Sequence, residues 1–237
     1  GGIPTNYHGE VVTLKDGNPD AVVPGLMAIG EAACVSVHGA NRLGSNSLID
    51  LVVFGRAAGL KCAADIKPGE RQPELAKGAG DSALARLDRF RNAKGGTPTA
   101  QLRTRMQKAM QNHCPVFRVG AELKKGCDAV AQVYRDAAGI EVSDRSMIWN
   151  SDLVEALEFD NLIAQAAVTV EGAFTREESR GGHAREDFPN RDDAKWMKHT
   201  LSWFDTKTGK VKLDYRPVHT YTLSNDVEYI APKARVY

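Results

Sequence analysis

The spacing of hydrophobic and polar residues divides the chain into three regions, and the first mixes strands with a helix. Glu10–Leu14 and Ala21–Val23 are typical of strands on either side of a turn at Asp16–Pro19. Leu26–Gly30 has the pattern of a short apolar strand. From Asn46 to Ile66, apolar and small residues recur at helical spacing, which predicts a helix that can pack closely on neighbouring backbone.

The second region has a helical pattern throughout. We predict helices over Ser82–Asn92, from Thr97 to about His113, over Val119–Ala137 and over Asp152–Glu171. Thr97 followed by Pro98 is typical of an N-cap with Pro at the first helical position. Cys114-Pro115 ends that helix. These patterns favour an antiparallel helical bundle.

The third region is polar, irregular and aromatic. Leu201–Phe204 and Lys210–Tyr215 flank Thr206–Gly209, which indicates a β-hairpin. We expect this region to fold back over the other two or against a partner. The predicted fold class is α+β, with an α/β remnant at residues 1–67, a helical bundle at 68–172 and a mostly irregular region with a hairpin at 173–237.

Composition excludes several classes of function. The 237 residues include 31 basic and 30 acidic side chains, a net charge of +1, which gives no electrostatic footprint for nucleic acid or an anionic membrane. No apolar run approaches the roughly 20 residues that span a bilayer. The start at Gly1-Gly2, without Met, suggests a fragment or a processed product.

The cysteines and one glycine motif point away from two further kinds of site. Four cysteines without CxxC spacing predict buried thiols rather than disulfides or metal ligands, so we expect no metal site: Cys34, Cys62, Cys114 and Cys127. Residues 78–83 match the GxGxxA pattern, but polar residues precede them instead of a strand. The sequence therefore predicts no pyrophosphate-binding turn of its own.

The stretch from Val23 to Asp50 carries the candidate chemistry. It places an acid, Glu31, at a strand end, then Arg42 among glycines, then a helix start near Asn46. Such an acid can accept hydrogen bonds from sugar hydroxyls, a helix N-terminus offers free N–H groups, and an arginine can hold a carboxylate with two hydrogen bonds. Each is also compatible with a cap or a surface residue. The residues alone predict only a cofactor and anion site.

One run of sequence is far more specific. HGANRLGSNSLIDLVVFGRAAG, at residues 38–59, closely resembles the flavoprotein subunits of succinate dehydrogenase and fumarate reductase, as do GGIPTN at the start and GLMAIGEAACVSVHGANR upstream. ESRGGHAREDFP at 178–189 and RPV at 216–218 agree, so the resemblance covers the chain in collinear order. The lead-in ACVSVHG is more similar to succinate dehydrogenase than to L-aspartate oxidase.

The resemblance implies a cofactor, FAD, and a role for six residues. Residues 1–67 would be the C-terminal remnant of an FAD-binding domain. Glu31 would hydrogen-bond the ribityl chain of FAD. Asn46, Ser47 and Leu48 would bind the cofactor, the last two through backbone N–H groups at the pyrimidine edge. Arg42 would bind a carboxylate of succinate or fumarate, with His38 supporting it.

The roles of three further residues stay open. Asn41 lies in the same loop as Arg42 and would support the site. His183 and Arg185 would either line the site from the helical side or, as we favour, tie the tail to the core.

The resemblance also implies an activity and an assembly. Succinate would be oxidised to fumarate by hydride transfer to FAD, with electrons passed to an iron–sulfur subunit and, indirectly, to membrane anchor subunits. The subunit would be peripheral, on the cytoplasmic face of a bacterial inner membrane or the matrix face of the mitochondrial one. The alternatives are a fumarate reductase or, for this chain alone, a non-catalytic docking module.

The family's pyrophosphate loop, its covalent FAD attachment site and its proton-transferring arginine have no counterpart in this sequence. No catalytic residue is therefore assigned here, and we expect the chain to be inactive alone.

Overall fold

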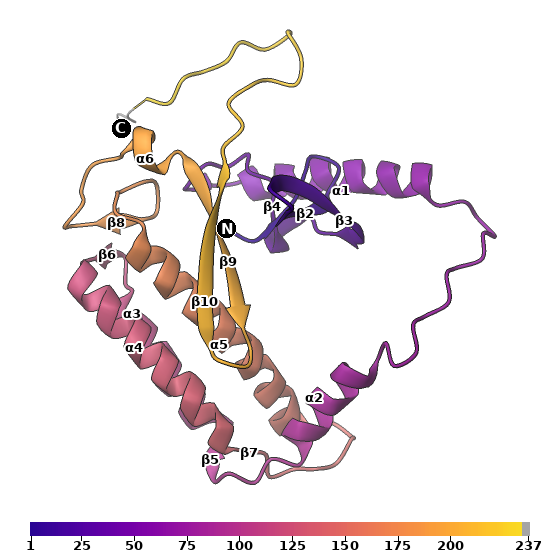
Figure 1. Ribbon diagram of the computed structural model, residues 1–237, viewed down its shortest axis with the longest axis vertical. Coiled ribbons are helices and arrows are strands. Elements are labelled where there is room, and N and C mark those ends of the chain that lie inside the picture. Colours follow the sequence, from indigo (N-terminus) through magenta and orange to yellow (C-terminus); the bar gives the residue numbers. More distant parts are fainter. Residues whose placement is uncertain (234–237) are drawn as a thin grey trace.

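The chain folds into a helical bundle, a long β-hairpin beside it, and an N-terminal unit of short strands around one long helix (Figure 1). The computed structural model describes residues 1–233. The elements are β1 (Ile3–Pro4), β2 (Glu10–Lys15), β3 (Asn18–Met27), η1 (Gly30–Ala32), β4 (Ala33–Cys34), α1 (Asn46–Asp65), α2 (Asp81–Arg91), β5 (Thr97–Pro98), α3 (Thr99–His113), β6 (Phe117–Arg118), α4 (Gly120–Asp136), η2 (Ala137–Gly139), β7 (Ile140–Glu141), α5 (Ser151–Thr175), β8 (Ala184–Arg185), α6 (Asp193–Trp196), β9 (Lys198–Asp205) and β10 (Lys210–Pro217). This mixture agrees with the α+β class, whereas the three domain boundaries stay predictions.

The first hairpin forms around a turn that needs left-handed backbone. Asp16 and Gly17 have φ of 53° and 79°, as a two-residue type I′ turn requires. They join β2 to β3, which pair antiparallel, so the predicted hairpin is confirmed. The separate strand predicted at Leu26–Gly30 is wrong. Its first two residues end β3, and Gly30, with φ of 64°, begins the 3-10 turn η1 because the chain must bend there.

Helix α1 confirms the predicted helix within one residue of its end. It packs against the N-terminal unit through Ala58, which is buried. A Cβ on Gly9 would lie 3.1 Å from the Cβ of Ala58, so small residues on both sides permit this approach. The other face of α1 is bare: Leu48, Ile49 and Val52 are 65%, 62% and 71% exposed.

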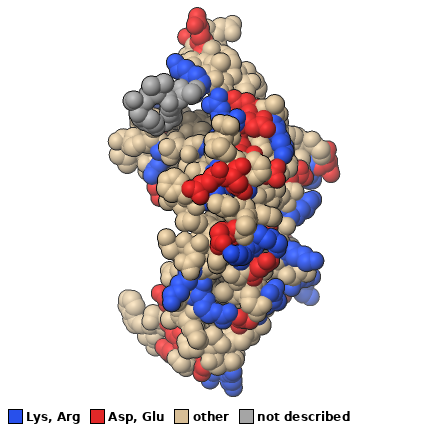
Figure 2. All heavy atoms as spheres, turned by 90° about the vertical axis from the view of Figure 1, so that its left-hand side faces the viewer, with Lys and Arg blue, Asp and Glu red and all other residues tan. Residues whose placement is uncertain are grey.

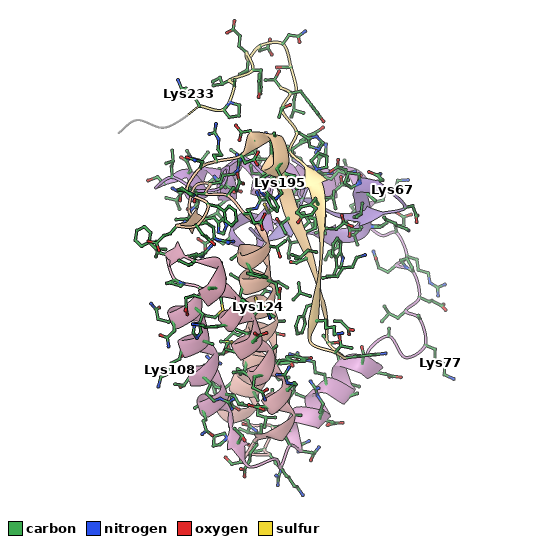
Figure 3. The ribbon with its side chains drawn as sticks, turned by 60° about the vertical axis from the view of Figure 1, so that its left-hand side comes forward. Lys67, Lys77, Lys108, Lys124, Lys195 and Lys233 are labelled. Carbon is green, nitrogen blue, oxygen red and sulfur yellow. The ribbon has the colours of Figure 1, made fainter. Side chains whose placement is uncertain are left out.

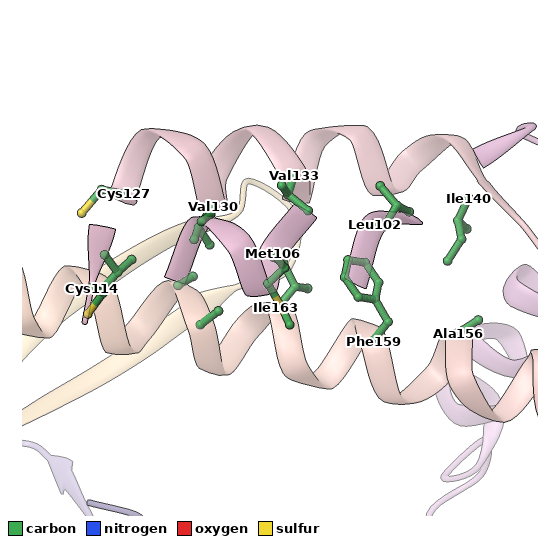
Figure 4. Close-up of a cluster of buried hydrophobic side chains, with 14 of the residues drawn as sticks. Leu102, Met106, Cys114, Cys127, Val130, Val133, Ile140, Ala156, Phe159 and Ile163 are labelled. Carbon is green, nitrogen blue, oxygen red and sulfur yellow. The ribbon is translucent and has the colours of Figure 1, made fainter. Parts of the chain in front are cut away.

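Helices α3, α4 and α5 form the predicted bundle. Their apolar faces converge on one cluster, where Leu102, Leu123, Phe159 and Ile163 are at most 1% exposed. Figure 4 shows Leu102, Phe159 and Ile163 pointing from facing helices into a shared interior. The Asn150 side chain caps α5 by accepting a hydrogen bond from the Leu153 backbone N–H at 2.8 Å.

Two helix ends differ from the prediction. Thr97-Pro98 does not begin a helix but forms β5, paired in parallel with β7. Helix α3 starts one residue later, with Pro98 as an extended N-cap residue at ψ of 143°. Helix α5 extends to Thr175, four residues beyond the expected end. At Thr97-Pro98, tertiary pairing rather than local residue preference sets the boundary.

The C-terminal region folds back over the bundle and β3. Strands β9 and β10 pair in full register around the predicted turn at residues 206–209 and pack on α5 (Figure 1). Tyr134 of α4 donates a hydrogen bond to the backbone carbonyl of Thr206 at 2.6 Å. At the other end, the buried Arg216 pairs with Asp20 of β3 at 2.6 Å. The short helix α6 was not predicted.

The four cysteines are free, but only two are buried. Cys114 and Cys127 lie in the bundle core, whereas Cys34 and Cys62 are only half-buried, so the prediction of buried thiols holds for one pair. Burial, with Glu171 nearby, raises the pKa of the Cys127 thiol to about 12. That thiol is therefore neutral and unreactive at physiological pH.

Charged side chains of both signs are interspersed over the surface. Figure 2 shows lysine and arginine beside aspartate and glutamate across the visible face. Lys67, Lys108 and Lys195 lie on different parts of the molecule (Figure 3). Within residues 1–233, no helix combines the length and apolar character needed to cross a membrane.

The bundle core yields a stability prediction. Replacing Phe159 with alanine should lower the free energy of unfolding by about 3–5 kcal/mol, because the side chain is 1% exposed and its removal leaves a cavity. Urea unfolding followed by circular dichroism measures the change. Val154→Ala on the same helix, where valine is 53% exposed, is the matched control and should have a small effect. Equal losses for the two variants would contradict the assigned core.

Candidate functional site

The sequence stretch singled out above encloses a hollow of about 350 Å³. It lies between the end of the first hairpin, the loop at residues 35–45 and the start of α1. Backbone turns shape it: Ser36 and Gly39 have φ of 73° and 65°. The lining residues are Gly1, Gly30, Glu31, Ala33, Cys34, Val35, Ser36, His38, Gly39, Ala40, Asn41, Arg42, Ser47 and Asp50.

An imidazole–carboxylate pair fixes the loop to the helix. His38 Nε2 lies 2.6 Å from Oδ2 of Asp50 in the first turns of α1. Asp50 is only 8% exposed, and its Oδ1 has no hydrogen-bond partner among the described residues. That oxygen is itself shielded from solvent. The pair therefore anchors the loop to α1 at the wall of the hollow.

Arg42 pairs with Glu31 across the mouth of the hollow. One guanidinium nitrogen of Arg42 donates to Oε1 of Glu31 at 3.2 Å, and the two side chains are 48% and 79% exposed. Ion pairs this exposed contribute little free energy because water screens them and the side chains lose freedom. An incoming carboxylate can therefore replace Glu31 as the partner of Arg42 at low cost.

The start of α1 offers fewer free amides than the sequence suggested. Ser45 precedes the helix in a left-handed conformation, with φ of 66° and no side-chain cap. The backbone N–H of Leu48 already donates to the Ser45 carbonyl at 3.1 Å, and that of Asn46 donates to Leu43 at 3.3 Å. Of these helix residues, only Ser47 and Asp50 line the hollow.

Four of the six residues predicted for the site thus share one hollow. Glu31, His38, Arg42 and Ser47 line it together, and Asn46 and Leu48 do not. Asn41, which the sequence also placed near the site, lines it too. Sequence reasoning missed Asp50. Its signal was present, since Asp50 is the single acid of α1 before its last residue, Asp65.

Comparison with known proteins tests the family resemblance stated from the sequence. The family model described as fumarate reductase flavoprotein C-term matches residues 103–237, which is more than half of the chain. The chain belongs to this flavoprotein family. Residues 1–48 match the model of an FAD binding domain. The resemblance stated from the sequence is therefore confirmed.

Individual relatives place this flavoprotein chain within longer proteins. The mitochondrial succinate dehydrogenase flavoprotein subunit of Oryza sativa subsp. japonica is 56% identical over 100% of this chain and 37% of that protein. The subunit of Rickettsia bellii is also 56% identical, over 100% of this chain and 40% of that protein. A structure of E. coli quinol fumarate reductase has a TM-score of 0.83 at 33% identity, covering 96% of this chain and 37% of that chain. The chain spans about two fifths of the curated relatives it matches.

In this flavoprotein chain, residues 178–189 contact the loop at residues 35–45, called the site loop below. The backbone N–H of Gly182 donates to the carbonyl of Ala40 at 3.0 Å. A Cβ on Gly181 would lie 2.5 Å from the carbonyl carbon and oxygen of Ala40, so the two backbones are in direct contact. The segment at residues 178–189 therefore forms part of the support of the site.

Arg185 and His183 anchor this segment to the bundle, the alternative favoured from the sequence. Arg185 is 3% exposed and donates to the carbonyls of Ala173 and Phe174 at the end of α5, which lack helical partners. It also holds Asp187 with two hydrogen bonds of 2.8 Å, which lowers the pKa of that carboxyl to about 2. The half-buried His183 bridges Arg118 to a backbone carbonyl, and burial lowers its pKa. Neither residue lines the hollow.

Glu178 is the centre of the segment. Its side chain is fully buried and accepts hydrogen bonds from Arg176 at 2.6 Å, from Arg180 at 2.7 and 2.9 Å, and from the backbone N–H of Asp192 at 3.0 Å. Burial alone would raise the pKa of Glu178, but the hydrogen bonds from Arg180, Asp192 and Arg176 lower it overall. The carboxylate is therefore held in its charged form.

This network predicts both a mutational effect and a pH dependence. Glu178→Gln should lower the free energy of unfolding at pH 7 by about 3–5 kcal/mol, because the partly buried Arg176 loses its carboxylate partner and Arg180 loses one of two. The folded pKa of Glu178 is below its ordinary value of 4.5, so its contribution is complete above that pH and is lost as the pH falls through the folded pKa. Urea unfolding between pH 7 and pH 3 should therefore show a weaker pH dependence for Glu178→Gln than for the unmodified protein.

The neighbouring residue supplies the control for this experiment. Glu177 is half exposed and forms a surface ion pair with Lys195 at 2.9 Å. Glu177→Gln should leave the free energy of unfolding nearly unchanged, because exposed ion pairs contribute little. If both variants behaved alike, the assigned burial and pairing of Glu178 would be incorrect.

Proposed function

We propose that this chain forms the substrate-binding side of a succinate dehydrogenase flavoprotein subunit, which oxidises succinate to fumarate. One observation carries the proposal: Arg42, Glu31 and Ser47 line a single hollow. The 56% identity with two succinate dehydrogenase flavoprotein subunits supports it over the whole chain. A dicarboxylate has the size and charge that an arginine beside a small polar hollow would select.

The residues around the hollow fit part of an FAD molecule. The volume of the hollow, about 350 Å³, suits one ring system or a small acid rather than a whole dinucleotide. Glu31, which is exposed and acidic, would accept hydrogen bonds from the hydroxyl groups of the cofactor. Ser47, at the positive end of α1, would face its electronegative edge. When bound, FAD supplies the acceptor for a hydride, which carries the two electrons of the oxidation.

The role of Arg42 in this proposal is to bind and orient. Its planar guanidinium would exchange Glu31 for a substrate carboxylate and hold it with two parallel hydrogen bonds. Orientation matters because hydride transfer needs the reacting carbon close to its acceptor. His38, held by Asp50 at 2.6 Å, would keep the loop that bears Arg42 in place. The proton acceptor is not assigned to any residue of this chain.

We further propose a partner and a location. Electrons would leave through an iron–sulfur subunit, which would connect this subunit to membrane anchors on the matrix or cytoplasmic face. Support comes from likeness to a mitochondrial relative and to a quinol fumarate reductase structure. The second candidate function is the reverse reaction, fumarate reduction, which that structural likeness favours. The direction depends on the redox partner as well as on the site.

Arg42→Lys in the full-length subunit tests the substrate assignment. Lysine keeps the charge but cannot form two parallel hydrogen bonds with a carboxylate. The value of kcat/KM for succinate should fall at least about tenfold, because a hydrogen bond to a charged group contributes about 1.5–3 kcal/mol. Arg56→Lys on the exposed face of α1 is the matched control and should retain the original value. Normal turnover by Arg42→Lys would show that Arg42 does not bind the substrate carboxylate as proposed.

A second experiment separates the enzyme from a docking module. We expect the 237-residue chain alone to show neither flavin absorbance after purification nor succinate-dependent dye reduction, whereas the full-length subunit shows both. The physical reason is that the hollow contacts only one end of so large a cofactor. Stoichiometric flavin with turnover in the isolated chain would contradict this expectation. If the full-length subunit showed neither flavin absorbance nor succinate-dependent dye reduction, the proposed function itself would be contradicted.

A further inference from the structure

We propose that Gly181 is a positioning residue for substrate binding. It lies in the C-terminal segment, makes no contact with the substrate hollow itself, and sets where the loop bearing Arg42 can lie. The inference rests on the proposed function, since it concerns the same hollow. It extends that function by assigning part of the substrate affinity to a residue of the C-terminal region.

The contact between the two segments is made by backbone atoms. Gly182 donates its N–H to the Ala40 carbonyl at 3.0 Å. A Cβ built on Gly181 would lie 2.5 Å from the carbonyl carbon and oxygen of Ala40 and 2.8 Å from its Cβ. Backbone atoms cannot rotate out of the way as a side chain can. Gly181 also has φ of 58°, which favours glycine. A side chain at this position therefore forces one segment to move.

The C-terminal segment cannot be the one that moves easily. Arg180, directly before Gly181, donates to the buried Glu178 and to Asp193 at 2.8 Å. His183, two residues after it, is held by Arg118 at 2.8 Å and by the carbonyl of Arg176 at 3.0 Å. Backbone hydrogen bonds also join residues 180 and 183 directly. The glycine pair is thus held on both sides by a buried polar network.

The site loop is the softer side. Ala40 lies midway between His38, which is bound to Asp50, and Arg42, which has only the exposed partner Glu31 at 3.2 Å. A Cβ on Gly39 would meet nothing within 4 Å, so the loop has room to shift. Any displacement of Ala40 is therefore passed on toward Arg42 rather than toward the anchored His38. The position of the guanidinium depends on a residue far away in sequence.

A purely structural role for Gly181 makes a different prediction. If the glycine only permits a turn, its replacement lowers stability and the amount of active protein, but the surviving molecules keep their affinity for succinate. If it positions the loop, KM for succinate and the inhibition constant of a non-oxidisable dicarboxylate such as malonate both rise. Misplacement of a binding group by about 1 Å can cost about 100-fold.

The chain offers an adjacent control. A Cβ on Gly182 would lie 3.7 Å from the Ala40 carbonyl oxygen, an ordinary contact, and no left-handed φ is required there. Gly181→Ala and Gly182→Ala are therefore compared in the full-length subunit, with flavin content and melting temperature recorded for each. We expect KM and the malonate inhibition constant to rise at least about tenfold for Gly181→Ala and to stay within about twofold for Gly182→Ala.

The outcomes are distinct. An unmodified subunit that oxidises no succinate would refute the proposed function. An active subunit in which both variants share its KM would overturn the role of Gly181. If Gly181→Ala yields no folded protein, Ala40→Gly takes its place, because it loosens the site loop without altering the C-terminal segment. A KM raised at least about threefold by Ala40→Gly then supports the proposal, and an unchanged KM overturns it.

Discussion

The buried carboxylate of Glu178 is the interaction on which the arrangement of this molecule depends. A charge without exposure to water is tolerated only when several donors surround it. Here two arginine side chains and a backbone amide do so. Arg176 directly follows α5, and Arg180 directly precedes Gly181, which contacts the loop at the hollow. The Glu178 carboxylate binds both arginines and so joins the bundle to the hollow. A purely apolar contact would hold the same segments without fixing their direction.

The hollow itself is built the opposite way. Its polar groups are exposed or incompletely paired: Arg42 has one accessible partner, and Asp50 keeps an unused oxygen. Rigid support combined with loosely held polar groups is the arrangement expected of a binding site, since the groups are oriented in advance yet free to change partner. The network around Glu178 thus supplies the rigid support, and the hollow supplies the polar groups that can bind a ligand.

The sequence predicted the elements well wherever local chemistry decides them. The turn at Asp16-Gly17, the helix from Asn46 and the three bundle helices follow from residue preference and periodicity. The failures lie where tertiary contacts decide. Leu26–Gly30 ends β3 and enters η1, with the Met27 sulfur 3.3 Å from the Cys62 sulfur of α1, and Thr97-Pro98 pairs with a distant strand. For the site, a motif located Arg42 and Glu31, but the pairing of Asp50 with His38 depends on how the loop folds onto α1.

The bare face of α1 has a thermodynamic consequence. Leu48, Ile49 and Val52 keep more than half of their surface in water, and apolar groups in water raise the heat capacity of the solution. Whatever covers this face, within a longer chain or from outside it, must release that ordered water. Association through this face would therefore carry a negative change in heat capacity. Association through charged groups alone would lack that signature.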